Sequence, residues 1–176
     1  MEQRSWSLTT TDLIAGGLLA LAVVAVTALA GLHWLTAVGV GAIALVGPAL
    51  ARIDIAVRRL PNPLTLPTLA VAAAVTMIHA LSGNWLGPAV AAGCALLLAV
   101  LAFAGGMGMG DLKLGAAIVL AVSGTPLVPL VALSASFVFG GLAGLVMLVF
   151  GHRTLPFGPF LLLGLLAAFA VDCFVP

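Results

Sequence analysis

Hydrophobic residues along this chain form long runs, separated by short segments that contain glycine, proline and polar residues. A helix that crosses the hydrocarbon core of a bilayer needs about 20 apolar residues, and most of the runs approach this length. The pattern therefore predicts an all-α, polytopic transmembrane helix bundle of about seven spans. The predicted spans are residues 12–32, 34–53, 64–82, 88–106, 112–123, 127–150 and 157–175.

The fifth run is shorter than the others and directly follows a glycine-rich break. A short apolar segment beside such a break indicates backbone that lines a cavity rather than facing lipid. The first run, residues 13–32, is too long for the apolar core of a signal peptide, so we expect it to be a retained span.

Composition agrees with a membrane protein, because hydrophobic types make up 64% of the 176 residues and charged types only 6%. A soluble domain carries about 25% charged residues. The formal net charge of +1 gives no reason to expect a nucleic-acid partner. Cys94 and Cys173 lie in apolar stretches without CxxC spacing, so we expect neither a metal site nor a disulfide framework.

The basic residues predict the orientation, since Lys and Arg gather on the cytoplasmic side of a membrane protein. With the N-terminus inside, all six fall on the cytoplasmic side and none on the outer connections. We therefore expect a multi-pass protein of the plasma or inner membrane with a cytoplasmic N-terminus. The six are Arg4, Arg52, Arg58, Arg59, Lys113 and Arg153.

Two of the five acidic residues stand out by their positions. Asp54 lies at the inner end of the second predicted span and Asp111 at the inner start of the fifth. An ionisable residue at the edge of the hydrocarbon is a candidate functional residue. Glu2, Asp12 and Asp172 lie near the chain ends, where we expect interfacial or solvated side chains, with Asp12 capping or flanking the first span.

Two carboxyl groups that approach each other form a possible acid–base pair. Like charges at close range do not both ionise easily, so such a pair shares one proton. The ionised carboxylate then takes a proton from water, while the protonated one donates to a carbonyl oxygen. The alternative is structural, because Asp54 and Arg58 have the spacing of an ion pair along one helix.

Four glycines precede Asp111 and favour the catalytic interpretation. Gly105, Gly106, Gly108 and Gly110 leave little side-chain bulk there and let another backbone approach closely. An extended peptide bound by its backbone needs such access. The alternative is a small-residue face for helix packing.

These residues resemble the type IV leader peptidases, or prepilin peptidases, which are membrane aspartic proteases of the GxGD type. The resemblance spans about residues 35–165 and rests on three segments in the family's order. They are GMGMGDLKLGAA at residues 106–117, RIDIAVRRLPNPLTLP at residues 52–67 and LPFGPFLLLG at residues 155–164.

The resemblance implies that Asp54 and Asp111 are the two catalytic aspartates and that Gly108 and Gly110 are the motif glycines. Other motif positions are expected to support the structure or line the substrate; they are Pro61, Asn62, Lys113, Phe157, Gly158 and Pro159. For Lys113, two further roles stay open: it holds Asp111 in its charged state, or it extends to the lipid headgroups.

The family removes the short basic leader of prepilin-like precursors at the cytoplasmic face and needs no cofactor or metal for proteolysis. Larger members add a domain with paired CxxC motifs and methylate the new N-terminus. This sequence has no CxxC pair, so we expect the compact form, which cleaves only. We expect an N-terminal part, residues 1–33, and a peptidase-like membrane domain, residues 34–176, with the lipid bilayer and prepilin-like or pseudopilin precursors as partners.

Three alternatives remain. A presenilin-like protease would share the Gly-x-Gly-Asp motif and cut within a transmembrane helix. A transporter or proton relay would use Asp54 and Asp111 as titrating sites, but it predicts acids near mid-membrane. A membrane scaffold without enzymatic activity would tolerate replacement of both aspartates.

Overall fold

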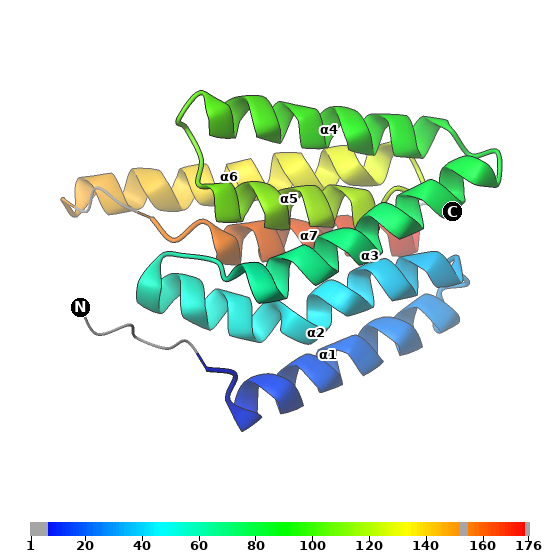
Figure 1. Cartoon of the computed structure of the whole chain (residues 1–176), viewed down its shortest axis with the longest axis horizontal. Coiled ribbons are helices and arrows are strands. Elements are labelled where there is room, and N and C mark those ends of the chain that lie inside the picture. Colours follow the sequence, from blue (N-terminus) through cyan, green and yellow to red (C-terminus); the bar gives the residue numbers. More distant parts are fainter. Residues whose placement is uncertain (1–6, 152–154, 175–176) are drawn as a thin grey trace.

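The computed structural model describes residues 7–151 and 155–174, and every regular element in these ranges is an α-helix. The seven helices run roughly side by side along one axis (Figure 1). The predicted all-α bundle is therefore confirmed. The helices are α1 (Thr10–Leu29), α2 (Trp34–Val57), α3 (Asn62–Leu81), α4 (Leu86–Phe103), α5 (Met109–Ala121), α6 (Leu127–Val149) and α7 (Gly158–Phe174).

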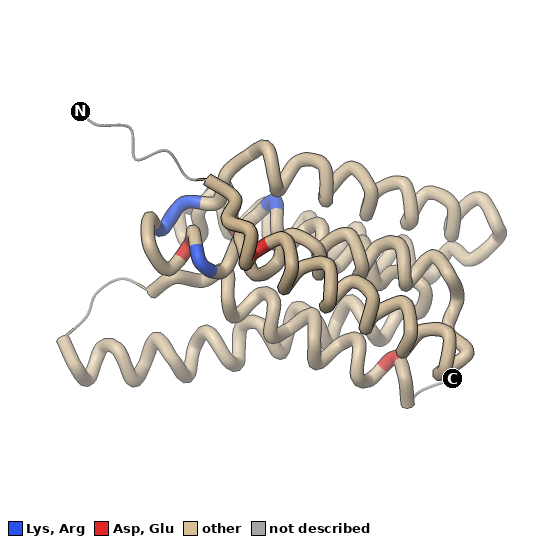
Figure 2. The backbone as a smooth tube through the Cα atoms, turned by 90° about the horizontal axis from the view of Figure 1, so that it is seen from below, with Lys and Arg blue, Asp and Glu red and all other residues tan. Residues whose placement is uncertain are grey.

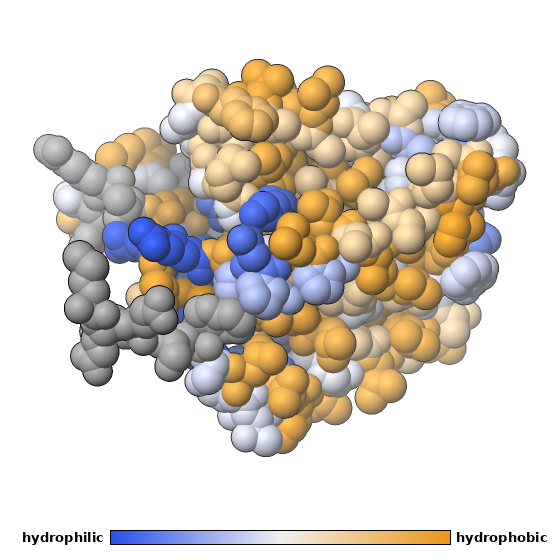
Figure 3. Space-filling view, in the orientation of Figure 1, coloured by the Kyte–Doolittle hydropathy of each residue, from blue (hydrophilic) through white to orange (hydrophobic). Residues whose placement is uncertain are grey.

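Five helices, α1, α2, α3, α4 and α6, are long and apolar enough to cross a membrane. Figure 3 shows hydrophobic side chains over most of one face of the bundle, as expected of a surface in contact with lipid. The chain is a multi-pass membrane protein. The shorter helices α5 and α7 have 13 and 17 residues.

Local sequence explains where many helices begin and end. Thr9 and Asp12 form a capping box at the start of α1, which satisfies free backbone N–H groups there. Residues with a left-handed backbone conformation follow the ends of several helices, as is common at helix C-termini. The glycines with positive φ are Gly31, Gly83, Gly105 and Gly151.

Helix α5 occupies the centre of the bundle, where it packs against α2, α3, α4, α6 and α7. Its buried positions include Gly115, Ala116 and Ala117, whose small side chains allow close packing. A helix that is apolar on every side is suited to such a buried place. The expectation that the fifth run would not face lipid is therefore confirmed.

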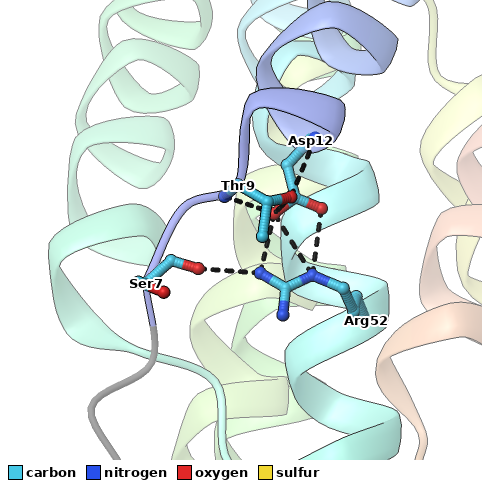
Figure 4. A network of polar contacts seen from close by, with 4 residues as sticks. All are labelled: Ser7, Thr9, Asp12 and Arg52. Atoms are coloured by element: carbon cyan, nitrogen blue, oxygen red, sulfur yellow. Dashed lines mark hydrogen bonds and ion pairs between the residues drawn. The ribbon is translucent and has the colours of Figure 1, made fainter.

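Helix α1 packs along α2, and a polar network joins them near their common end (Figure 4). Arg52 Nη2 donates to Asp12 Oδ2 over 2.7 Å and to the Ser7 carbonyl over 2.8 Å. Further along, a Cβ on Gly16 would collide with the carbonyl oxygen of Leu45, so a glycine is required for this approach.

We expected Asp12 and Asp172 to be interfacial or solvated; the solvated alternative is wrong, since their exposed fractions are only 6% and 8%. Asp12 is buried because it both caps α1 and pairs with Arg52. Its predicted capping role is confirmed. Glu2, Arg4 and Arg153 lie outside the described residues.

The basic residues that the structure describes lie together at one end of the bundle (Figure 2). These residues are Arg52, Arg58, Arg59 and Lys113. Asp54 and Asp111 belong to the same end, because α2 ends and α5 begins there.

Candidate active site

Asp54 lies in the last turn of α2, one residue beyond the predicted end of the second span. Its side chain is 4% exposed. The backbone N–H of Gly158, the first residue of α7, donates a hydrogen bond of 2.8 Å to Asp54 Oδ2. The N-terminal N–H groups of a helix have no partner within that helix, so the start of α7 is a suitable place for a carboxylate.

Gly158 approaches Asp54 so closely that no side chain fits between them. A Cβ on Gly158 would lie 2.9 Å from Asp54 Oδ2 and 3.2 Å from Cγ. Pro159 follows within the first turn of α7, where the missing N–H of a proline costs no helical hydrogen bond. The Phe-Gly-Pro segment thus places the start of α7 on Asp54.

Asp111 lies in the first turn of α5, again at a helix N-terminus, and outside the five long candidate spans. The pKa of Asp111 is raised from its usual 3.8 to about 6, first by burial and second by the negative charge of Asp54, while a hydrogen bond with the Gly108 backbone opposes the rise. The influence of Asp54 brings the two motif aspartates into one electrostatic site.

The two motif glycines make different close approaches. A Cβ on Gly108 would lie 3.1 Å from Asp111 Oδ2, so this glycine makes room for the carboxyl group itself. A Cβ on Gly110 would lie 2.9 Å from Leu60 Cβ and 3.3 Å from the Leu60 nitrogen. Gly110 therefore lets the start of α5 contact the α2–α3 connection, which follows Asp54.

A second contact joins the same segments. Lys113 Nζ donates a hydrogen bond of 2.6 Å to Asn62 Oδ1, and Asn62 is the first residue of α3. Pro61 is buried and stands at the N-cap of α3. The contact of Lys113 with Asn62 agrees with a structural role for Lys113.

Arg58 ends α2 in a left-handed conformation, with φ 54°, and its backbone N–H donates to the Asp54 carbonyl oxygen over 2.8 Å. Its charge also lies near enough to act on the Asp54 side chain. Arg58 is the only residue other than glycine with positive φ in the described part of the chain. The turn after Asp54 is thus a strained one, which suits a segment held in place by contacts from α5.

A cavity of about 350 Å³ opens beside Asp111. Phe157, next to Gly158, is part of its wall, so the cavity reaches the segment that binds Asp54. The sequence gives no sign that Leu101 or Phe137 belongs to the site, because apolar residues that line a cavity do not differ in type from lipid-facing ones. The lining residues are Leu101, Gly106, Met107, Gly108, Asp111, Phe137, Leu155 and Phe157.

Phe137 and Phe157 form one side of this cavity, with ring centroids 5.7 Å apart. Phe157 also packs over Gly140 of α6, where any added Cβ would contact its ring. The site therefore combines the Asp111 carboxyl group with a cavity whose other lining side chains are apolar. Among the described residues, no group of three His, Cys, Asp or Glu side chains is placed to hold a metal ion.

The family model of the type IV leader peptidases matches residues 43–145, which is more than half of the chain. The match contains both Asp54 and Asp111, and it ends before the Phe-Gly-Pro segment that begins α7. Comparisons with curated proteins and with solved structures give no significant match. By the family match, the chain belongs to the type IV leader peptidase family and is a protease of prepilin-like precursors.

Proposed function

We propose that this chain is an aspartic endopeptidase that removes the short basic leader of type IV prepilin-like precursors, with Asp54 and Asp111 as its catalytic pair. The observation that carries the proposal is that Asp54, in the last turn of α2, and Asp111, in the first turn of α5, lie at the same end of the bundle, beside a cavity of about 350 Å³ that Asp111 lines.

The chemistry follows from one proton shared by two carboxyl groups. The ionised aspartate takes a proton from a water molecule, which attacks the scissile carbonyl carbon. The protonated aspartate donates a hydrogen bond to the carbonyl oxygen, and a tetrahedral gem-diol forms. Its collapse breaks the C–N bond, and a proton passes to the leaving amine.

The position of the pair fits cleavage at a membrane surface. Asp54 lies three residues before the end of α2, and Asp111 is the third residue of α5. The basic residues at the same end support the proposal that it faces the cytoplasm. The apolar helix of the precursor would then lie along the bundle in the bilayer, with its leader in the cytoplasm.

The other motif residues support the aspartate pair and do not react. They are Gly108, Gly110, Pro61, Asn62, Lys113, Phe157, Gly158 and Pro159. The short contacts of Gly158 with Asp54 and of Gly110 with Leu60 support such a role. The proposed reaction uses side chains and water only. We propose cleavage without N-methylation, as in compact members of the family.

The test is to co-express the chain with a panel of prepilin-like precursors and to measure the mass of each product. We expect loss of a short N-terminal leader, and we expect Asp54→Asn and Asp111→Asn each to abolish it. Asp172→Asn is the matched control, because it changes a buried aspartate at the other end of the bundle. Processing that survives both active-site changes would reject the mechanism, and a cut inside the apolar helix would favour the presenilin-like alternative.

A further inference from the structure

A second polar cavity lies at the end of the bundle opposite the aspartate pair. It has a volume of about 470 Å³ and is lined by residues of the α1–α2, α3–α4 and α5–α6 connections and of the end of α7. Thr36 lines it near the start of α2, whereas Asp54 is near the end of that helix. At about 1.5 Å per residue, roughly 27 Å of helix separates the two positions.

Two buried polar side chains in this cavity have no partner in the described part of the chain. His79 is 5% exposed, and its Nε2 atom makes no hydrogen bond. Asp172 is 8% exposed and makes neither a hydrogen bond nor an ion pair with any described residue. Burial of an unpaired polar group is unfavourable, and burial of an unpaired charge more so.

Three neighbouring polar side chains already have a hydrogen-bond partner. The Asn84 side-chain amide donates to the Gly124 carbonyl over 2.6 Å, and the Ser82 hydroxyl donates to the His79 carbonyl over 2.9 Å. His33 Nδ1 accepts from the Leu35 N–H over 3.3 Å, so a neutral His33 carries its proton on Nε2. Among the buried polar side-chain atoms that the structure describes, His79 Nε2 is the one without a hydrogen bond, and Asp172 supplies the carboxyl group among the described residues that line the cavity.

The cavity lies at the level expected for lipid headgroups. Trp34 follows His33 and is 62% exposed, and Trp85 follows Asn84 and is 67% exposed. Exposed tryptophans mark the interfaces of a bilayer, where one part of the ring contacts lipid and the other water. A ligand can therefore reach this cavity from the headgroup region or from the aqueous phase.

The charges of the residues that line the cavity indicate which class of ligand it can bind. Asp172 is the only acidic residue that lines the cavity, and no Lys or Arg does so. The described residues offer no group of three His, Cys, Asp or Glu side chains placed to hold a metal ion. A nitrogen cation with N–H donors would pair with the Asp172 carboxylate and donate to His79 Nε2, provided the His79 proton is on Nδ1.

We propose that this cavity binds a primary ammonium group through Asp172 and His79. The headgroup of phosphatidylethanolamine and a soluble primary amine both carry this group. A quaternary ammonium has the same charge without N–H donors, so it does not satisfy His79. This site is independent of the proposed catalytic function.

The first test compares the unmodified protein in nanodiscs of phosphatidylcholine alone with nanodiscs that contain phosphatidylethanolamine. We expect a higher midpoint of thermal unfolding with phosphatidylethanolamine. In detergent, ethanolamine at fixed pH should raise the midpoint more than choline if a soluble amine enters the cavity. If only phosphatidylethanolamine raises the midpoint, the ligand is the lipid headgroup. If ethanolamine raises it as well, the cavity binds the primary ammonium group of the lipid and of the soluble amine. No difference in either comparison would overturn the proposal.

Substitutions of residues that line the cavity test whether the ammonium group binds there. Native mass spectrometry should show phosphatidylethanolamine retained by the unmodified protein and by Ser82→Ala, which alters a lining hydroxyl that already has its partner. Asp172→Asn should weaken retention about tenfold or more, because it removes the charge that the ammonium pairs with. Equal retention by Asp172→Asn and Ser82→Ala would contradict the assignment. The comparison of lipids in the unmodified protein decides the question even if Asp172→Asn does not fold.

Discussion

Gly158 donates its backbone N–H to Asp54 Oδ2 over 2.8 Å, although 104 residues separate the two along the chain. The contact places the start of α7 against the last turn of α2. It explains why a Phe-Gly-Pro segment begins the last helix, since a Cβ at Gly158 would lie 2.9 Å from the same carboxyl oxygen.

Replacement of Gly158 by alanine should therefore displace the Asp54 carboxyl group and reduce processing. A misplacement of about 1 Å in an active site can lower the rate about 10²-fold. The matched control is Gly141→Ala in α6, where an added Cβ meets no atom within 4 Å. The measurement is the initial rate of leader removal in detergent at equal amounts of folded protein. Equal rates for the two variants would show that Asp54 does not depend on this contact.

The pKa of Asp111 predicts a pH-dependent chemical modification. With a pKa of about 6, this carboxyl group is protonated below that pH and ionised above it. Carbodiimides react with protonated carboxyl groups, so labelling of Asp111, followed by mass spectrometry of its peptide, should fall as the pH rises through about 6.

Asp54→Asn should shift that labelling midpoint to lower pH. The negative charge of Asp54 raises the pKa of Asp111, and its removal leaves burial as the main cause of the remaining rise. Asp172→Asn serves as the control and should leave the midpoint unchanged. A midpoint that does not move in Asp54→Asn would mean that the two carboxyl groups do not interact.

The hydrogen bond between Lys113 and Asn62 should couple the start of α5 to the start of α3. A double-mutant cycle with Lys113→Met and Asn62→Leu should give a coupling of about 0.5–1 kcal/mol in the free energy of unfolding, since solvent weakens a partly exposed contact. Each single variant should also slow processing, because Lys113 lies two residues after Asp111. Arg59→Met is a control that removes an exposed positive charge nearby. Additive effects of the two substitutions would rule out the coupling.

The Asp12–Arg52 ion pair should stabilise the attachment of α1 to α2. Arg52→Met leaves the Asp12 carboxylate buried without its cation, which should lower the free energy of unfolding. We expect a smaller loss than that of breaking a fully buried pair, because the Arg52 side chain is 44% exposed and solvent screens its charge.

Asp12→Asn combined with Arg52→Met should recover part of that loss, since no buried charge is then left unpaired. Unfolding in mixed detergent micelles measures both effects. If the double variant is no more stable than Arg52→Met alone, the charge of Asp12 is not the source of the loss.

The sequence alone was sufficient to predict the helices and to single out the two motif aspartates as candidate site residues. A run of apolar residues in a bilayer must satisfy its own backbone hydrogen bonds, so each run predicts a helix with little dependence on the rest of the chain. Helices α2 and α5 in the structure extend a few residues beyond the predicted spans, so Asp54 lies in the last turn of α2 and Asp111 in the first turn of α5. An acid in an apolar sequence is conspicuous by its type, and the glycines beside Asp111 are conspicuous by their number.

Only the tertiary structure decided which residues these aspartates and their neighbours contact. The partners of Asp54, Lys113 and Arg52 lie 104, 51 and 40 residues away along the chain. His79 and Asp172 likewise meet in one cavity only because the connections and the end of α7 converge there. The pattern of apolar residues does not determine these contacts, because many arrangements of the helices bury the same apolar surface. Close packing at positions such as Gly16, Gly110 and Gly158 selects one arrangement among them.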